Sequence, residues 1–163
     1  MICLGVDPGK QSPAWALVER LGGRPTLLAC GLGPLGPLDW NALPRPDCGV
    51  VEVPVAYPGS KVNPNDLITL ALEAGRALGY MASRLRFIQG KGLGTVQEVK
   101  PADWKGQLPK PSKAGDAYIV ARRIIDRCHG TGHVQALDLA PSLEHNVWDA
   151  IGIAMFGLGV SIK

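Results

Sequence analysis

The first third of the chain predicts short strands joined by tight turns. Apolar runs cover residues 1–6, 14–19, 26–32 and 48–53, and Gly, Pro or Asp residues bound them. Because the turns between the first three runs are short, we expect these runs to form an antiparallel meander. Pro54 closes the fourth run, since proline cannot continue a central strand.

Beyond residue 63 the apolar positions change to a helical period. Apolar residues recur every three or four positions along 67–81, which predicts an amphipathic helix. Strands followed by helices that alternate with strands indicate an α/β domain, with a mixed sheet of about five strands flanked by helices. We expect one domain over residues 1–163. The other predicted elements are helices over 114–128 and 143–158, strands over 85–89 and 95–99, and a loop over 33–46.

Composition supports one globular domain and gives no sign of a membrane protein. The chain has 163 residues, of which 46% are hydrophobic and 19% charged. The longest uncharged apolar run, 150–162, is too short to cross a bilayer. No basic segment or cleavage site accompanies the apolar start, so we expect a soluble, cytoplasmic protein.

Charge is unevenly distributed along the chain. Residues 76–127 hold eleven Lys or Arg against four Asp or Glu, whereas the rest holds six against ten. This separation predicts a basic face for a polyanion beside an acidic pocket.

Three acidic residues lie in unusually apolar surroundings. Asp7 ends the first strand, Glu52 lies within VVEV, and Asp149 begins a nearly apolar helical stretch. Acids are rarely buried unless they are paired or bind a cation. Any one of them alone is more simply a satisfied core carboxylate, but the three together favour a hard-cation site for Mg²⁺ or Mn²⁺ rather than zinc. The run CHGTGH at 128–133 lacks a second ligand pair and predicts a helix end and a turn.

Four segments, in order along the chain, resemble the RuvC-type Holliday junction resolvases of the ribonuclease H-like superfamily. They are LGVDPGK, the VVEV strand, the basic stretch 99–123 and HNVWDAIGIA, and the match is closest to short phage-type members. The resemblance implies a ribonuclease H-like fold, a homodimer, and a place in the cytoplasm of a bacterial cell, with the gene carried by the host or by a phage. Such a dimer would introduce paired nicks across four-way or related branched DNA with Mg²⁺ or Mn²⁺.

The resemblance also implies roles for individual residues. Two metal ions roughly 3.5–4 Å apart can activate a water and stabilise the leaving oxygen of an in-line displacement. Asp7 would bridge both ions, while Glu52 and Asp149 would complete one coordination shell each. Lys105 or Lys113 would neutralise charge that develops on the phosphate.

Other residues of the basic stretch are candidates for binding DNA. Trp104 would either stack on an unpaired base or pack in the core, and the sequence favours neither alternative. The remaining DNA-binding candidates are Lys100, Lys105, Lys110, Lys113 and Arg122.

The residue that completes the metal site beside Asp149 stays open. The family usually has Asp or His three positions upstream, where this chain has Asn146, with His145 one further back. Both share a helix face with Asp149, whereas Glu144 lies off that face. Asn146 can ligate without charge, and His145 can ligate Mn²⁺ or carry a proton, so either predicts a preference for Mn²⁺. Otherwise His145 caps the helix and Asn146 bonds to Asp149.

Rival functions remain on the same fold. A catalytically inactive nucleic-acid-binding module and a nuclease that acts on RNA are the two alternatives. An ATP-binding domain would need a second phosphate loop, for which this chain has no room. The loop 33–46 stands where the family has a helix, which leaves the breadth of substrates open. For a dimer interface, the helix over 67–81 is the candidate, although its apolar stripe suits the core equally well.

Overall fold

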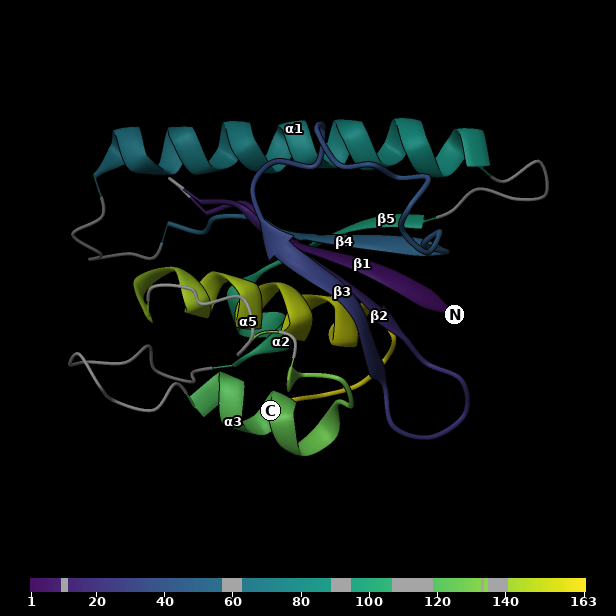
Figure 1. The fold of residues 1–163 in the computed structure, drawn as a ribbon. Helices are drawn as coiled ribbons and strands as arrows, with labels where there is room; N and C mark the ends of the chain where they lie inside the picture. The colour runs from purple at the N-terminus through teal and green to yellow at the C-terminus, as the bar shows by residue number, and fades with distance from the viewer. Residues whose placement is uncertain (10–11, 57–62, 89–94, 107–118, 133, 135–140) are drawn as a thin grey trace.

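A five-stranded mixed sheet runs through the middle of the molecule (Figure 1). The computed structural model describes residues 1–9, 12–56, 63–88, 95–106, 119–132, 134 and 141–163. The strand order is β3-β2-β1-β4-β5; β1, β2 and β3 are antiparallel neighbours, and β4 and β5 run parallel to β1. The strands are β1 (Ile2–Asp7), β2 (Ala14–Glu19), β3 (Thr26–Leu32), β4 (Cys48–Glu52) and β5 (Thr95–Val99).

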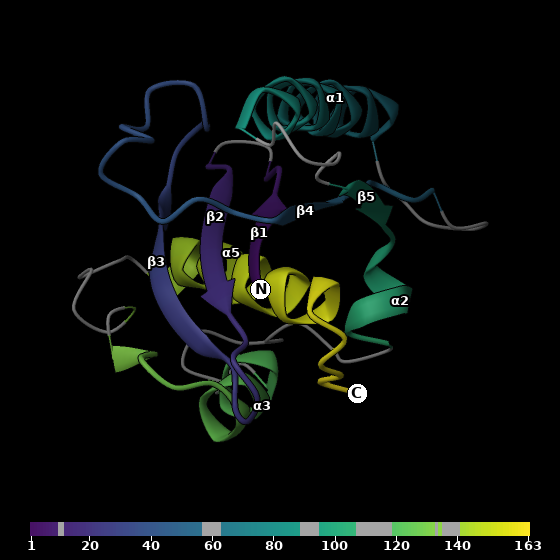
Figure 2. The ribbon, with the colours of Figure 1, turned by 90° about the vertical axis from the view of Figure 1, so that its right-hand side faces the viewer.

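Helices cover both faces of this sheet. The long helix α1 (Pro64–Ile88) lies on one face, and α5 (Pro141–Gly157) crosses the other (Figure 1). Helix α3 (Ile119–Arg127) packs on α5, and the short α2 (Pro101–Trp104) lies beside α5 as well (Figure 2). No helix in the described part of the chain is both long and apolar enough to cross a membrane.

Most of the predicted elements are present, with one clear error. The meander, the strands predicted at 48–53 and 95–99, and the absence of a helix in 33–46 are confirmed. The strand predicted at 85–89 is wrong, because α1 continues through Ile88. Met81 and Leu85 both lie against Gly49 of β4, so the apolar residues near position 85 extend the buried stripe of the helix. Gln89 and residues 114–118 of the second predicted helix lie outside the described residues.

Strand geometry decides which side chains reach each face of the sheet. Successive side chains point to opposite faces, so Leu4 and Val6 of β1 enter the core beneath α1, whereas Cys3 enters the core beneath α5. On β4 the same alternation puts Val51 under α1 and Val50 under α5. The acids that end these two strands therefore emerge on the α5 face.

Gly5 allows α5 to lie directly on β1. A Cβ at this position would lie 2.3 Å from the backbone oxygen of Ala150 and 2.4 Å from the backbone nitrogen of Ala154. The two backbones are thus in contact, with small residues on both sides. Since Ala150 follows Asp149, this contact brings the helix acid toward the end of β1.

We predict that Gly5→Ala lowers the free energy of unfolding by about 1–3 kcal/mol or more, because the added methyl group meets backbone atoms that cannot rotate away. Denaturant unfolding measures the change. The matched control is Gly36→Ala, since a Cβ at Gly36 meets no atom within 4 Å; this change should stay within about 0.5 kcal/mol. Equal stabilities of the two variants would contradict the close packing of α5 on β1.

Candidate active site

Two of the three predicted acids lie side by side at the carboxyl ends of two inner strands of the sheet. Asp7 and Glu52 end β1 and β4, which are parallel neighbours whose register pairs Val6 with Val51. The next residues along both strands therefore lie side by side on the α5 face. Asp149 of α5 is buried, with 1% of its surface exposed, and approaches them from the helix that covers this face.

The charges of Glu52 and Asp149 act on the buried carboxyl of Asp7. Asp7 is buried, and burial together with the negative charges of Glu52 and Asp149 raises its pKa from 3.8 to about 7. The backbone N–H of Gly9 donates to Asp7 Oδ1 at 3.2 Å, and this bond and the positive charge of Lys105 only partly oppose the rise. The site therefore holds more negative charge than its own surroundings neutralise.

Lys105 supplies the positive charge at the centre of the site. Its Nζ donates to Asp149 Oδ2 at 2.8 Å and lies 3.7 Å from Glu52 Oε2. Burial alone would lower the pKa of this ammonium, but Asp149 and Glu52 outweigh burial and the pKa is raised. Lys105 is therefore charged at neutral pH, although only 9% of its side chain is exposed.

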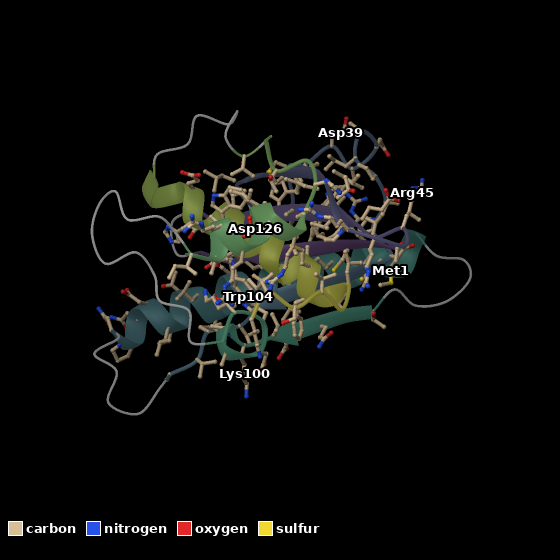
Figure 3. The ribbon with its side chains drawn as sticks, turned by 90° about the horizontal axis from the view of Figure 1, so that it is seen from below. Met1, Asp39, Arg45, Lys100, Trp104 and Asp126 are labelled. Atoms are coloured by element: carbon tan, nitrogen blue, oxygen red, sulfur yellow. The ribbon has the colours of Figure 1, made fainter. Side chains whose placement is uncertain are left out.

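Trp104 holds the second carboxylate in place. Its Nε1 donates to Glu52 Oε2 at 2.6 Å, and its ring lies 4.7 Å below the Lys105 ammonium. The ring is buried against Gly152 of α5, where a Cβ would lie only 2.4 Å from a ring carbon. Of the two roles proposed for Trp104, packing is the one that matches these surroundings, since both ring faces are inside the protein. Figure 3 shows Trp104 turned toward α5 and Lys100 at the outer side of α2.

The residues just before Asp149 lie near the same turn. Asn146 donates through Nδ2 to the backbone oxygen of Ser12 at 2.9 Å and lies beside Gly9, so it faces the turn that follows Asp7. His145 is half-buried. Glu144 accepts a bond from Trp148 Nε1 at 3.0 Å, along its own helix. Asn146 is thus the candidate fourth ligand that the structure places against the Asp7 turn.

The chemical types of the possible ligands suit a hard divalent cation. Three carboxylates and an amide are the oxygen ligands that Mg²⁺ and Mn²⁺ prefer. Within the described residues, however, no group of three or more His, Cys, Asp or Glu side chains is spaced to hold a metal ion. Two of the three carboxylates, those of Glu52 and Asp149, instead contact the ammonium of Lys105.

Two solved structures share this architecture over nearly their whole length. Thermus thermophilus RuvC aligns with a TM-score of 0.52 and 20% identity, covering 98% of each chain. The fowlpox virus Holliday junction resolvase aligns with a TM-score of 0.51 and 12% identity, covering 98% of this chain and 99% of the other. This chain has the ribonuclease H-like fold of these resolvases. Neither a protein-family model nor a curated protein sequence matches it.

The candidate DNA-binding residues lie in different surroundings. Lys100 and Arg122 are exposed, on α2 and α3, whereas Lys105 is buried in the acidic site. Arg76 and Arg84 belong to α1, on the opposite side of the sheet from α3 (Figure 1). The basic residues of 76–127 that the structure describes thus lie on both sides of the sheet, and they do not form the single basic face expected. Lys110, Lys113 and His133 lie outside the described residues.

A cavity of about 520 Å³ adjoins the end of β1 on the α1 side. Val6, Pro8 and Gly9 line it, together with Arg76 and Tyr80 of α1. Because Val6 and Asp7 point to opposite faces of the sheet, the cavity is separate from the carboxylates.

The raised pKa of Asp7 predicts how stability depends on pH in protein stripped of metal by a chelator. An unfolded Asp ionises near pH 4, whereas Asp7 in the folded protein stays protonated up to about pH 7. The stability that Asp7 contributes is therefore full below pH 4 and is lost between pH 4 and 7. Asp7→Asn has no proton to lose, so its free energy of unfolding should exceed that of the wild type increasingly over this window, by up to about 4 kcal/mol at pH 8.

Denaturant unfolding at several pH values measures this difference. Asp126→Asn, which alters an exposed residue of α3, is the control and should follow the wild type throughout. A stability difference between Asp7→Asn and the wild type that does not change with pH would show that the pKa of Asp7 is not raised in the folded protein.

Proposed function

We propose that this protein is a structure-specific DNA endonuclease that resolves four-way junctions, or related branched DNA, by metal-dependent hydrolysis of phosphodiester bonds. The observation that carries the proposal is the meeting of Asp7, Glu52 and Asp149, from two parallel strands and a helix, at one edge of a ribonuclease H-like sheet. The fold shared with two resolvases supports it. Hydrolysis of a polyanion explains why a small domain keeps three acids that repel one another.

The residues of the proposed site would have different roles. Asp7, Glu52 and Asp149, with Asn146 beside them, would hold Mg²⁺ or Mn²⁺, whose chemistry is to activate water and to stabilise the leaving oxygen. Asp7 must give up its proton to act as a ligand, and a pKa of about 7 makes this easy near neutral pH. Trp104 orients Glu52 through its hydrogen bond, so it positions a ligand without touching the substrate.

Cleavage assays test the proposal and its alternatives together. A labelled four-way junction, a linear duplex and RNA would each be incubated with Mg²⁺, Mn²⁺ or a chelator. We expect paired nicks in the junction with either metal and none with the chelator. Asp7→Asn should reduce the cleavage rate at least a thousandfold while junction affinity stays within a few-fold or rises, because removing a carboxylate also relieves repulsion of the phosphates.

Asp126→Asn is the matched control and should cleave like the wild type. Binding without cleavage under every condition would favour the inactive module, and cleavage of RNA alone would favour the RNA nuclease. Cleavage by Asp7→Asn at the wild-type rate would overturn the assigned site.

We further propose that the protein acts as a homodimer through the outer face of α1. Part of the predicted stripe is core, since Ala74 and Met81 are buried against the sheet. On the outer face Ile68 and Leu72 are 58% and 59% exposed, and a Cβ at Gly75 or at Gly79 would meet no atom within 4 Å. These four positions follow one another at spacings of four, three and four, so they share one side of the helix. Paired nicks need two sites, and a twofold dimer supplies them.

Sedimentation analysis tests the dimer. The wild type should sediment as a dimer at micromolar concentration, and Leu72→Arg as a monomer, because a charge would be buried at the interface. Ile119→Arg, which alters an exposed apolar residue of α3, should leave the dimer intact. A monomeric wild type, alone and with junction DNA, would contradict this arrangement.

A further inference from the structure

We infer that Lys105 is a built-in cation that holds the acidic site together before a divalent ion binds, and that the ion displaces it. This inference rests on the proposed metal-dependent function and concerns how the site is loaded. It differs from the role predicted from the sequence, in which Lys105 only meets the substrate phosphate.

The position of the ammonium is the first argument. Nζ contacts Asp149 Oδ2 at 2.8 Å and lies 3.7 Å from Glu52 Oε2, so it stands between carboxylates of two different elements. Asp7 also acts on it electrostatically. The Nζ group therefore lies where a cation shared by Glu52 and Asp149, and close enough to act on Asp7, would lie.

Charge is the second argument. One ammonium carries a single positive charge and cannot neutralise three carboxylates. A divalent ion brings twice the charge and binds carboxylate oxygen at about 2.0–2.1 Å when it is Mg²⁺. Such an ion bound to the same oxygens would repel an ammonium at 2.8 Å, so the two cations compete for one place.

The local structure lets Lys105 leave while its neighbours stay. Trp104 packs on Gly152 and bonds to Glu52, so the position of Glu52 does not depend on the lysine. Lys105 follows the last residue of α2, and Gly106 after it has a left-handed φ of 65°. The ammonium sits on a flexible four-carbon stem. Once displaced, it lies at the edge of the site, within reach of a substrate phosphate.

Calorimetric titration of Mn²⁺ into chelator-treated protein, without DNA, tests the competition. Lys105→Met keeps the length of the side chain and removes its charge, so it should bind Mn²⁺ at least tenfold more tightly than the wild type. Lys163→Met is the control, because Lys163 is exposed and is not part of the acidic site, so this change should leave the affinity unchanged. Equal or weaker binding by Lys105→Met would overturn the inference and leave the proposed function intact. No binding of Mn²⁺ by any of the three proteins would overturn both.

A second measurement covers the case in which Lys105→Met is unfolded without metal. Folding of that variant on addition of Mn²⁺, seen by circular dichroism, would support the inference, and failure to fold at millimolar Mn²⁺ would contradict it. In the wild type, NMR of lysine ammonium groups should show a Lys105 signal protected from solvent exchange, which Mg²⁺ abolishes. A protected signal that persists at saturating Mg²⁺ would contradict displacement.

Discussion

Repulsion between three carboxylates is the constraint on which the site depends. Asp7, Glu52 and Asp149 are brought to one edge of the sheet, where burial and mutual charge raise the pKa of Asp7 to about 7. Trp104 and Lys105 are neighbours in the chain, and each donates a hydrogen bond to one of the other two acids. Trp104 donates to Glu52 and Lys105 to Asp149, and the ammonium of Lys105 offsets part of the repulsion. The arrangement favours any group that adds positive charge, and a divalent ion adds the most.

Glycine makes this crowding possible. Gly5 lets the backbone of α5 lie on β1, and Gly152 opens a place for the Trp104 ring on the same helix. Gly152 follows Asp149 by three positions, so the two residues share one face of α5, and Trp104 and Lys105 meet that face together. The packing of α5 on the sheet therefore also determines where the acids lie relative to one another.

The fold and the three acids could be predicted from the sequence because their signals are local. Apolar runs bounded by turns mark strands, and an acid inside such a run is conspicuous, as Asp7 and Glu52 are. The end of α1 was missed because a short apolar run near Leu85 suits a strand and a helix alike. The four-residue α2 has too few residues for any period to show.

The positions of Lys105 and Trp104 inside the site could not be predicted in the same way. Lys105 was a candidate for contacting the phosphate, and for Trp104 stacking on a base and packing in the core were equal alternatives. The packing of Trp104 depends on Gly152, which lies nearly fifty residues further along and carries no signal of its own. The division of the basic residues between α1 and α3 likewise depends on which face of the sheet each helix covers.

The central claim is that the three acids form a site for divalent ions, and anomalous diffraction from crystals grown with Mn²⁺ tests it most directly. The account predicts a manganese peak within coordination distance of carboxylate oxygens of Asp7, Glu52 and Asp149, with the Lys105 ammonium moved away from them. Crystals in which Mn²⁺ is absent from this edge of the sheet at millimolar concentration, and Lys105 still bonds to Asp149, would contradict it.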